Sequence, residues 1–168
     1  MADVVAFDEF YLATRADLLR QLTAMTGDPE MAQDVLQEAY ARGWQRWSRV
    51  SGLEDPAAWV RTVAWRLAVS QFRRRKVADR FLAGLRRRAL DIPAPEDVWD
   101  LDDALRRLNP VFRQALVLHD LYGYPVEQIA NECGVAVGTV KSRLSRGRAA
   151  LAASLGVDYR EPAREDTR

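Results

Sequence analysis

The 168-residue chain contains a single cysteine, Cys133, and a single histidine, His119. A lone cysteine excludes an intramolecular disulfide framework and a Cys-rich zinc site, and a lone histidine argues against His-based metal sites and a Ser-His-Asp arrangement. No apolar run approaches the roughly 18 residues that a membrane span needs. The start, "MADVVAFDEF", lacks the basic stretch and apolar core of a signal peptide. We therefore expect no metal, no cofactor, no membrane insertion and a cytoplasmic, nucleoid-associated location.

Acidic residues are nearly missing from residues 61–90, which hold ten basic side chains and one acidic side chain, Asp79. Residues 1–60 are acidic, with 5 basic against 10 acidic side chains, and residues 91–135 are acidic again, with 3 against 9. Residues 136–168 return to a basic balance of 7 against 4. Two separated basic blocks predict two contacts with a polyanion, although solvated helix faces would give the same pattern. A nuclease would need a carboxylate cluster near the basic surface, so we expect no enzymatic activity.

Strand patterns are also missing, and helical spacing of apolar residues recurs along the chain. Residues 7–26 form one such stretch, after which Asp28 is suited to cap a new helix with Pro29 in its first turn. Further helices are expected over residues 97–108, 110–121, 126–133 and 137–154. The sequence predicts an all-α fold of two small helical domains, 1–76 and 97–156, joined by a flexible linker, 77–96, and followed by a disordered tail, 157–168.

The segment "VEQIANECGVAVGTVKSRLSRGRAAL" has the pattern of a helix-turn-helix. Gly134 follows the first helix, where a left-handed residue is wanted, and Ala130 is small where the helices would cross. Val140 and Leu144 lie four residues apart and would anchor the second helix to the core. The polar residues left on the outside can contact phosphates or base edges: Thr139, Lys141, Ser142, Arg143, Ser145, Arg146 and Arg148. The alternative is a helical hairpin with a solvated basic face.

The segment "AWVRTVAWRLAVSQFRRRK", residues 58–76, has aromatic and cationic residues on more than one face of a helix. The face expected to meet the core contains Val60, Val63, Ala64 and Leu67. A second strip contains Trp59, Thr62, Arg66, Ser70 and Arg73, and a third edge contains Arg61, Trp65 and Phe72. An exposed aromatic can stack on an unpaired base, at about 1–3 kcal/mol per base, while arginines follow the backbone. Either tryptophan could instead belong to the core.

These motifs, in this order, resemble the extracytoplasmic-function (ECF) sigma factors of the sigma-70 superfamily. "GDPEMAQDVLQEAYARGWQRW" is similar to their polymerase-binding helix, and "LNPVFRQALVLHDLYGYPVEQIA" with the helix-turn-helix is similar to their promoter-binding domain. "LAVSQFRRR" and "VGTVKSRLSRGRAAL" resemble the SigE-type actinobacterial subset. The resemblance covers residues 7–155. The first domain would thus be sigma region 2, a helical bundle, and the second sigma region 4.

The resemblance implies a transcription initiation factor whose partners are core RNA polymerase and promoter DNA, with an anti-sigma factor left open as a further partner. Docking on the β′ clamp helices would involve Asp34, Gln37 and Glu38, and the second domain would meet the β flap. Recognition and melting of the −10 element would involve Trp59, Arg61, Thr62, Trp65, Arg66, Ser70, Arg73 and Arg74. The helix 137–154 would read the −35 element. The loop "SRVSGLED" would hold a flipped base.

One departure from the commoner ECF pattern leaves the −10 base preference open: Trp65, Arg66 and Ser70 stand where that pattern has Arg, Asn and Asp. A rival interpretation is a stand-alone helix-turn-helix regulator that binds duplex DNA without polymerase. Such a regulator would need a dimer surface to read two half-sites, and no helix remains to provide one.

Overall fold

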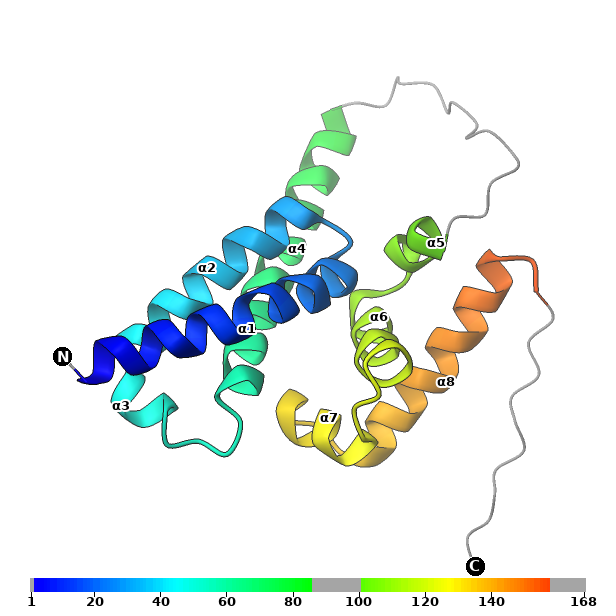
Figure 1. Ribbon diagram of the computed structural model, residues 1–168. Coiled ribbons are helices and arrows are strands. Elements are labelled where there is room, and N and C mark those ends of the chain that lie inside the picture. The colour runs from blue at the N-terminus through cyan, green and yellow to red at the C-terminus, as the bar shows by residue number, and fades with distance from the viewer. Residues whose placement is uncertain (1, 86–100, 158–168) are drawn as a thin grey trace, which may run out of the picture. The chain divides into compact units, whose positions relative to one another are not determined.

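The computed structural model describes residues 2–85 and 101–157. The regular elements within these ranges are all helical, which confirms the expected all-α class. They belong to two units, Met1–Val98 and Trp99–Arg168, each with its own buried core (Figure 1). Residues 86–96 of the expected linker and residues 158–168 of the expected tail lie outside the described residues.

Within residues 2–85, the first unit has four helices that follow one another along the chain: α1 (Ala2–Thr26), α2 (Pro29–Gln45), α3 (Trp47–Val50) and α4 (Pro56–Leu85). Helix α1 ends at Gly27, whose φ of 69° lies in the left-handed region that glycine adopts without strain. Helix α2 begins at once, because the Asp28 carboxylate accepts a hydrogen bond from the Met31 amide at 3.0 Å. The expected N-cap and the proline in the first turn are thus confirmed.

The core of the first unit lies where α2 packs against both α1 and α4. Its fully buried side chains come from all three helices: Leu18, Leu22, Met25, Met31, Val35, Ala39, Val60, Ala64 and Ala68. Aromatic rings close one end, where Phe7 packs edge-on against Trp47 at 5.1 Å and against Tyr40 at 6.4 Å between ring centroids. Burial of Trp47 and Val50 accounts for the short helix α3, so the expected loop 48–55 is reduced to residues 51–55.

Helix α4 is longer than the sequence suggests. It continues to Leu85, past the expected end of the first domain at residue 76, and its last turns extend beyond the start of α2 (Figure 1). Basic residues are good helix formers, so the run that follows Arg73 continues the helix without a stop signal. The first nine residues of the expected linker, 77–85, are therefore helical.

The described part of the second unit contains five helical segments: α5 (Leu101–Arg107), α6 (Pro110–Leu116), the π-helical turn η1 (Val117–Leu121), α7 (Val126–Cys133) and α8 (Val137–Ser154). Helix α8 packs along α6 and also contacts α5 and α7. Asn109 caps α6 by accepting a hydrogen bond from the Val111 amide at 3.1 Å. The buried guanidinium of Arg113 donates to the carbonyls of Leu105 and Arg106, which ties α6 to the end of α5.

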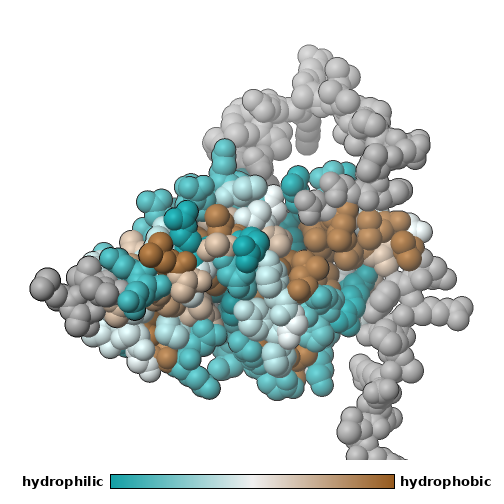
Figure 2. Space-filling model, viewed as in Figure 1, coloured by the Kyte–Doolittle hydropathy of each residue, from teal (hydrophilic) through white to brown (hydrophobic). Residues whose placement is uncertain are grey.

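The surface is largely hydrophilic in the view of Figure 2, with a broad apolar area on the second unit over α8. Three large apolar side chains are exposed among the described residues of this unit: Leu101, at the start of α5, Leu121, at the end of η1, and Val157, just after α8. None of the helices among the described residues is long and apolar enough to cross a membrane.

Candidate nucleic-acid and polymerase interface

The DNA-facing strip expected on α4 lies opposite the buried face of that helix. Val60, Ala64 and Ala68 are fully buried, whereas Arg66 and Ser70 are exposed. Arg73 and Arg74 are also exposed, and Trp59 and Thr62 are half-buried at the same side. The helical period therefore brings Trp59, Thr62, Arg66, Ser70 and Arg73 onto one solvent-accessible strip.

Two residues expected on the DNA side of α4 are buried instead, and this expectation is corrected. Arg61 is 2% exposed and donates a hydrogen bond from Nη1 to Gln21 Oε1 of α1 at 2.7 Å. Trp65 is 7% exposed and meets Phe72 edge-on at 6.4 Å. The reason is that α1 and α2 both cover α4, so its buried face is wider and is centred nearer to residues 61, 65 and 68. Val63 and Leu67, expected in the core, are half-buried.

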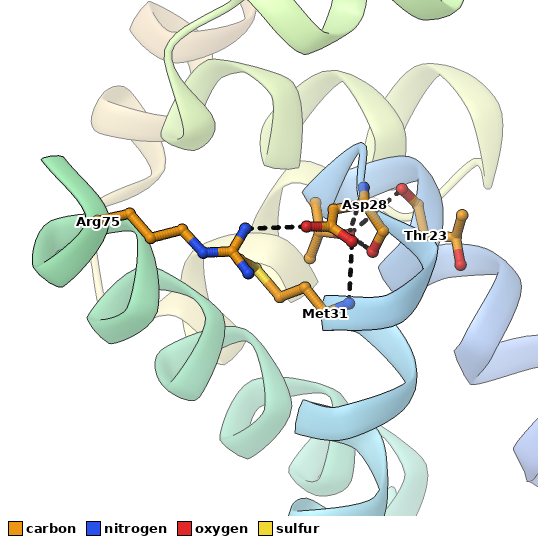
Figure 3. A network of polar contacts seen from close by, with 5 residues as sticks. Thr23, Asp28, Met31 and Arg75 are labelled. Carbon is orange, nitrogen blue, oxygen red and sulfur yellow. Dashed lines mark hydrogen bonds and ion pairs between the residues drawn. The ribbon is translucent and has the colours of Figure 1, made fainter. Parts of the chain in front are cut away.

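A polar network fastens the far end of the strip to the rest of the first unit (Figure 3). Arg75 reaches from α4 to the start of α2, where its Nη1 donates to Asp28 Oδ2 at 2.9 Å. The other oxygen of the same carboxylate caps α2 through the Met31 amide. These two hydrogen bonds, the backbone one first, lower the pKa of the Asp28 carboxyl below its usual range. One side chain thus fixes both the α1–α2 turn and α4.

The loop before α4 is short and exposed. Residues 51–55 are all exposed, and they include the apolar side chain of Leu53. Asp55 ends the loop, because its Oδ1 accepts a hydrogen bond from the Ala58 amide at 2.9 Å at the start of α4. The loop is therefore anchored at the helix while its tip faces solvent.

The acidic face of α2 points away from the core. Asp34, Gln37 and Glu38 are exposed, whereas the residues beside them in sequence, Val35 and Leu36, are buried. Glu38 accepts a hydrogen bond from Arg42 Nε at 2.8 Å, an exposed pair spaced i to i+4 that adds little to stability. The three polar residues thus share one accessible face, as their spacing predicts.

The helix-turn-helix of the second unit comprises α7 and α8, whose bounds agree with the expected ranges. Gly134 caps α7 with a φ of 65°, and Val140 and Leu144 are buried, as expected. Ala130 is buried between the two helices. On the outer side of α8 the exposed polar residues are Thr139, Lys141 and Arg146, and the half-buried ones are Ser142, Arg143 and Ser145.

Arg148, also expected to face DNA, is held within the second unit. Its Nε donates to Asp120 Oδ2 at 3.0 Å, and its Nη2 donates to Asp120 Oδ1 at 2.6 Å. His119 Nδ1 lies 2.7 Å from the same Oδ1 atom. Partial burial alone would raise the pKa of Asp120, but the hydrogen bonds from Arg148 and His119 outweigh it and lower that pKa.

Gly147 permits the close approach of α8 to α6. A Cβ at this position would lie 3.1 Å from Leu116 Cδ1 and 3.3 Å from Phe112 Cβ, which is tighter than ordinary van der Waals contact. Close packing therefore explains a glycine in the middle of a helix that otherwise favours alanine. Among the described residues no group of three or more His, Cys, Asp or Glu side chains is placed to hold a metal ion.

Two sequence families match the chain, one for each unit. Sigma-70 region 2 matches residues 10–77, and Sigma-70, region 4 matches residues 99–151. The RNA polymerase sigma-E factor of Streptomyces coelicolor is 35% identical over 155 residues, which cover 90% of this chain and 86% of that protein. The chain belongs to the ECF RNA polymerase sigma factors. The ECF sigma factor SigL of Mycobacterium tuberculosis is 31% identical over 161 residues, which cover 92% of this chain and 91% of that protein.

Solved structures share the fold of this chain. The sigma factor RpoE of Bartonella quintana, crystallised with the anti-sigma factor NepR, matches with a TM-score of 0.72 and 26% identity, covering 92% of this chain and 99% of that one. CnrH, in complex with the cytosolic domain of CnrY, shares the fold at a TM-score of 0.61 and 22% identity.

Two residues that sequence reasoning did not select stand out in this sigma factor. Trp44 is 43% exposed beside the acidic face of α2, although its ring also packs on Phe7 at 5.2 Å. Asp120 accepts hydrogen bonds from Arg148 of α8. The position of Trp44 follows from the helical period of α2, whereas the distance in sequence between Asp120 and Arg148 hides their contact.

Proposed function

We propose that this sigma factor directs promoter-specific initiation through three surfaces: the acidic face of α2 for polymerase, the strip of α4 for the −10 element and the outer side of α8 for the −35 element. The observation that carries the proposal is the strip of α4, where the half-buried Trp59 is followed along the same face by the exposed Arg66 and Arg73. A duplex hides the faces of its bases, so this combination suits a strand that has been opened. Captured bases would offset the few kcal/mol that each extruded base costs.

The −10 surface comprises Trp59, Thr62, Arg66, Ser70, Arg73 and Arg74, without the buried Arg61 and Trp65. Trp59 would stack on a base, and the arginines would follow the phosphates of the non-template strand. Loop residues 51–55 would hold a flipped base, and the exposed Leu53 gives that loop an apolar contact for it. Because Arg66 and Ser70 are exposed at the centre of the strip, they would determine the base preference.

Core RNA polymerase would dock on the face of α2 formed by Asp34, Gln37 and Glu38, through the β′ clamp helices. The exposed ring of Trp44 beside this face is the kind of anchor that dominates binding energy at interfaces. A second contact would join the β flap to an apolar surface of the second unit, on which Leu101, Leu121 and Val157 are exposed side chains. The two contacts are of different character, one acidic and one apolar.

The −35 element would be read by α8 in the major groove, with Thr139, Ser142, Arg143 and Arg146 on its outer side. Lys141 and Ser145 lie on the same helix and would contact phosphates. NepR and CnrY bind relatives of this fold. An anti-sigma factor of this chain would cover the same surfaces and compete with polymerase and DNA. The protein would act in the cytoplasm at the nucleoid, without catalysis of its own.

The decisive experiment is transcription in vitro with core RNA polymerase from a related bacterium and a pool of genomic promoter fragments. Start sites that require the chain, and whose upstream sequences share −35 and −10 elements, are expected. Asp34→Lys with Glu38→Lys should abolish transcripts from every promoter, whereas Asp17→Lys, on the exposed surface of α1, should not. Tight duplex binding without any transcript would instead favour a stand-alone regulator.

A single substitution separates melting from promoter binding. Trp59→Ala is expected to slow open-complex formation, followed by permanganate reactivity of unpaired thymines, while duplex binding stays near normal. A stacked base is worth about 1–3 kcal/mol, which corresponds to a loss of about fivefold to a hundredfold or more. Thermal unfolding is the control, because an equal loss of stability would show that Trp59 serves the core instead.

A further inference from the structure

Arg148 lies at the edge of the buried side of α8 rather than on its outer side. Leu144 precedes it by four residues and Gly147 by one, and both are buried. Residues four apart lie on the same face of a helix, so Arg148 projects towards the body of the second unit. Arg146, two residues earlier, is exposed on the outer side. The two arginines therefore have different surroundings despite their proximity in sequence.

The body of the unit offers Arg148 a carboxylate in a defined position. Asp120 accepts hydrogen bonds from both Nε and Nη2 of Arg148, so it binds the planar guanidinium along one edge. This bidentate geometry is stronger and more directional than a single hydrogen bond. Both side chains are about one third exposed, at 32% for Arg148 and 35% for Asp120, so water screens them less than a surface pair.

The backbone around Asp120 is unusual in a way that serves this contact. Residues 117–121 form a π-helical turn, in which the Tyr122 amide donates to the Val117 carbonyl, five residues back, at 3.1 Å. Gly123, with a φ of 69°, then ends the segment. Such single wide turns are frequent at functional sites, and this one lies shortly before the helix-turn-helix. In the same turn, His119 Nδ1 lies 2.7 Å from Asp120 Oδ1 and also holds this carboxylate in place.

We propose that Asp120 is a positioning residue for −35 recognition: by gripping Arg148 it fixes the rotation of α8 against η1, and Arg148 acts through Asp120 rather than by touching DNA. This inference rests on the proposed −35 role of α8. It removes Arg148 from the residues that contact DNA, and it leaves Thr139, Ser142, Arg143 and Arg146 to do so. The contact between Asp120 and Arg148 thereby holds the C-terminal half of α8, beyond the residues that would enter the groove first.

Electrostatics alone gives the opposite expectation for Asp120, and this makes the proposal testable. Removing a carboxylate near a DNA-binding surface normally strengthens binding, because one repulsive charge is lost. If Asp120 positions α8, then Asp120→Asn weakens binding instead, since the fork to Arg148 loses its charge. Residues in one ion-pair network are energetically coupled, so we expect binding to weaken about threefold to tenfold.

The experiment measures binding of the full chain to a duplex carrying the −35 element of a promoter found in the transcription assay, over a range of salt concentrations. The variants are Asp120→Asn, Arg148→Gln, the exchanged pair Asp120→Arg with Arg148→Asp, and Arg146→Gln as the matched control. Each phosphate contact contributes about 0.9 to the slope of log affinity against log salt. Arg148→Gln should therefore weaken binding without changing this slope, and the exchanged pair should recover most of the lost affinity.

Several outcomes would overturn the inference. A salt slope lowered by Arg148→Gln, or an exchanged pair that binds no better than Arg148→Gln although its circular dichroism shows a folded chain, would mean that Arg148 touches DNA itself. Stronger binding by Asp120→Asn would also contradict it. If the exchanged pair does not fold, the salt slope of Arg148→Gln decides alone. Failure of the unaltered chain to prefer this duplex over an unrelated one would refute the proposed −35 role instead.

Discussion

Charge at a single residue does not tell whether that residue serves the core or the nucleic acid. Arg61 and Arg66 lie on the same helix in the same basic block, yet Arg61 is buried on Gln21 while Arg66 is exposed. A buried guanidinium that donates to a buried amide is part of the packing, because an unmade hydrogen bond inside the protein costs about 1–3 kcal/mol. An exposed arginine on a strip with Trp59 is available to a phosphate.

At this residue scale we expect Arg61→Met and Arg66→Met to have separate effects. Arg61→Met should lower the free energy of unfolding of the first unit by about 1–3 kcal/mol, because Gln21 loses a partner in the core. Arg66→Met should change it by less than about 0.5 kcal/mol but weaken binding of single-stranded DNA. Urea unfolding and oligonucleotide titration provide the two measurements. Equal stability of both variants would contradict the assigned burial of Arg61.

At the scale of the helix, the Asp28 carboxylate stabilises two elements at once, and its charge controls both. Because its pKa is lowered in the folded chain from an ordinary value near 3.8, the stabilisation is complete above that value and is lost as the pH falls through the folded pKa. We expect acid to destabilise the first unit below pH about 4, measured by thermal unfolding at a series of pH values. Asp28→Asn, which retains the cap but not the charge, should flatten this dependence, whereas Asp28→Ala should cost about 1 kcal/mol at neutral pH.

The two glycines of α8 offer a matched pair for the packing of that helix. Nothing lies within 4 Å of a Cβ at Gly138, whereas a Cβ at Gly147 would press on Leu116 and Phe112. Glycine costs a helix interior about 1 kcal/mol relative to alanine. Gly138 lies in the first turn of α8, where this cost is smaller, so Gly138→Ala should raise the free energy of unfolding of the second unit by no more than about 0.5 kcal/mol. Gly147→Ala, although in the helix interior, should give no gain. A comparable gain for Gly147→Ala in thermal unfolding would show that Leu116 yields easily.

The boundaries of a helix could be predicted from the sequence where the residues at its ends determine them. The buried face of a helix could not be predicted where several neighbouring helices determine it. The bounds of α7 and α8 follow from Gly134 and the spacing of Val140 and Leu144. The rotation of α4 did not follow from its own sequence, because two other helices cover it and draw Arg61 and Trp65 into the core. The pairing of Arg148 with Asp120 could not be predicted from the sequence for a related reason, because the two partners lie 28 positions apart.

At the scale of the whole molecule, the nearly neutral net charge of +1 conceals two basic helices, α4 and α8, in two separate units. Each unit buries its own core, with Leu22 and Val35 in the first and Leu118 and Val140 in the second. Each unit is therefore expected to fold by itself. Recognition of two promoter elements then depends on the chain that connects the units, because a second contact made within one molecule occurs at an effective concentration of about 1 mM or more for short connections.

This dependence can be measured by dividing the chain into fragments 1–85 and 99–157. Circular dichroism of each fragment should show a cooperative thermal transition, which establishes that each folds alone. With core polymerase, the mixed fragments should give little transcription at concentrations where the intact chain is saturating, and activity should rise as both are increased towards the effective concentration of the connected units. Equal activity of fragments and intact chain at the same low concentration would mean that the −10 and −35 contacts need no covalent coupling, and that polymerase alone brings the two units together.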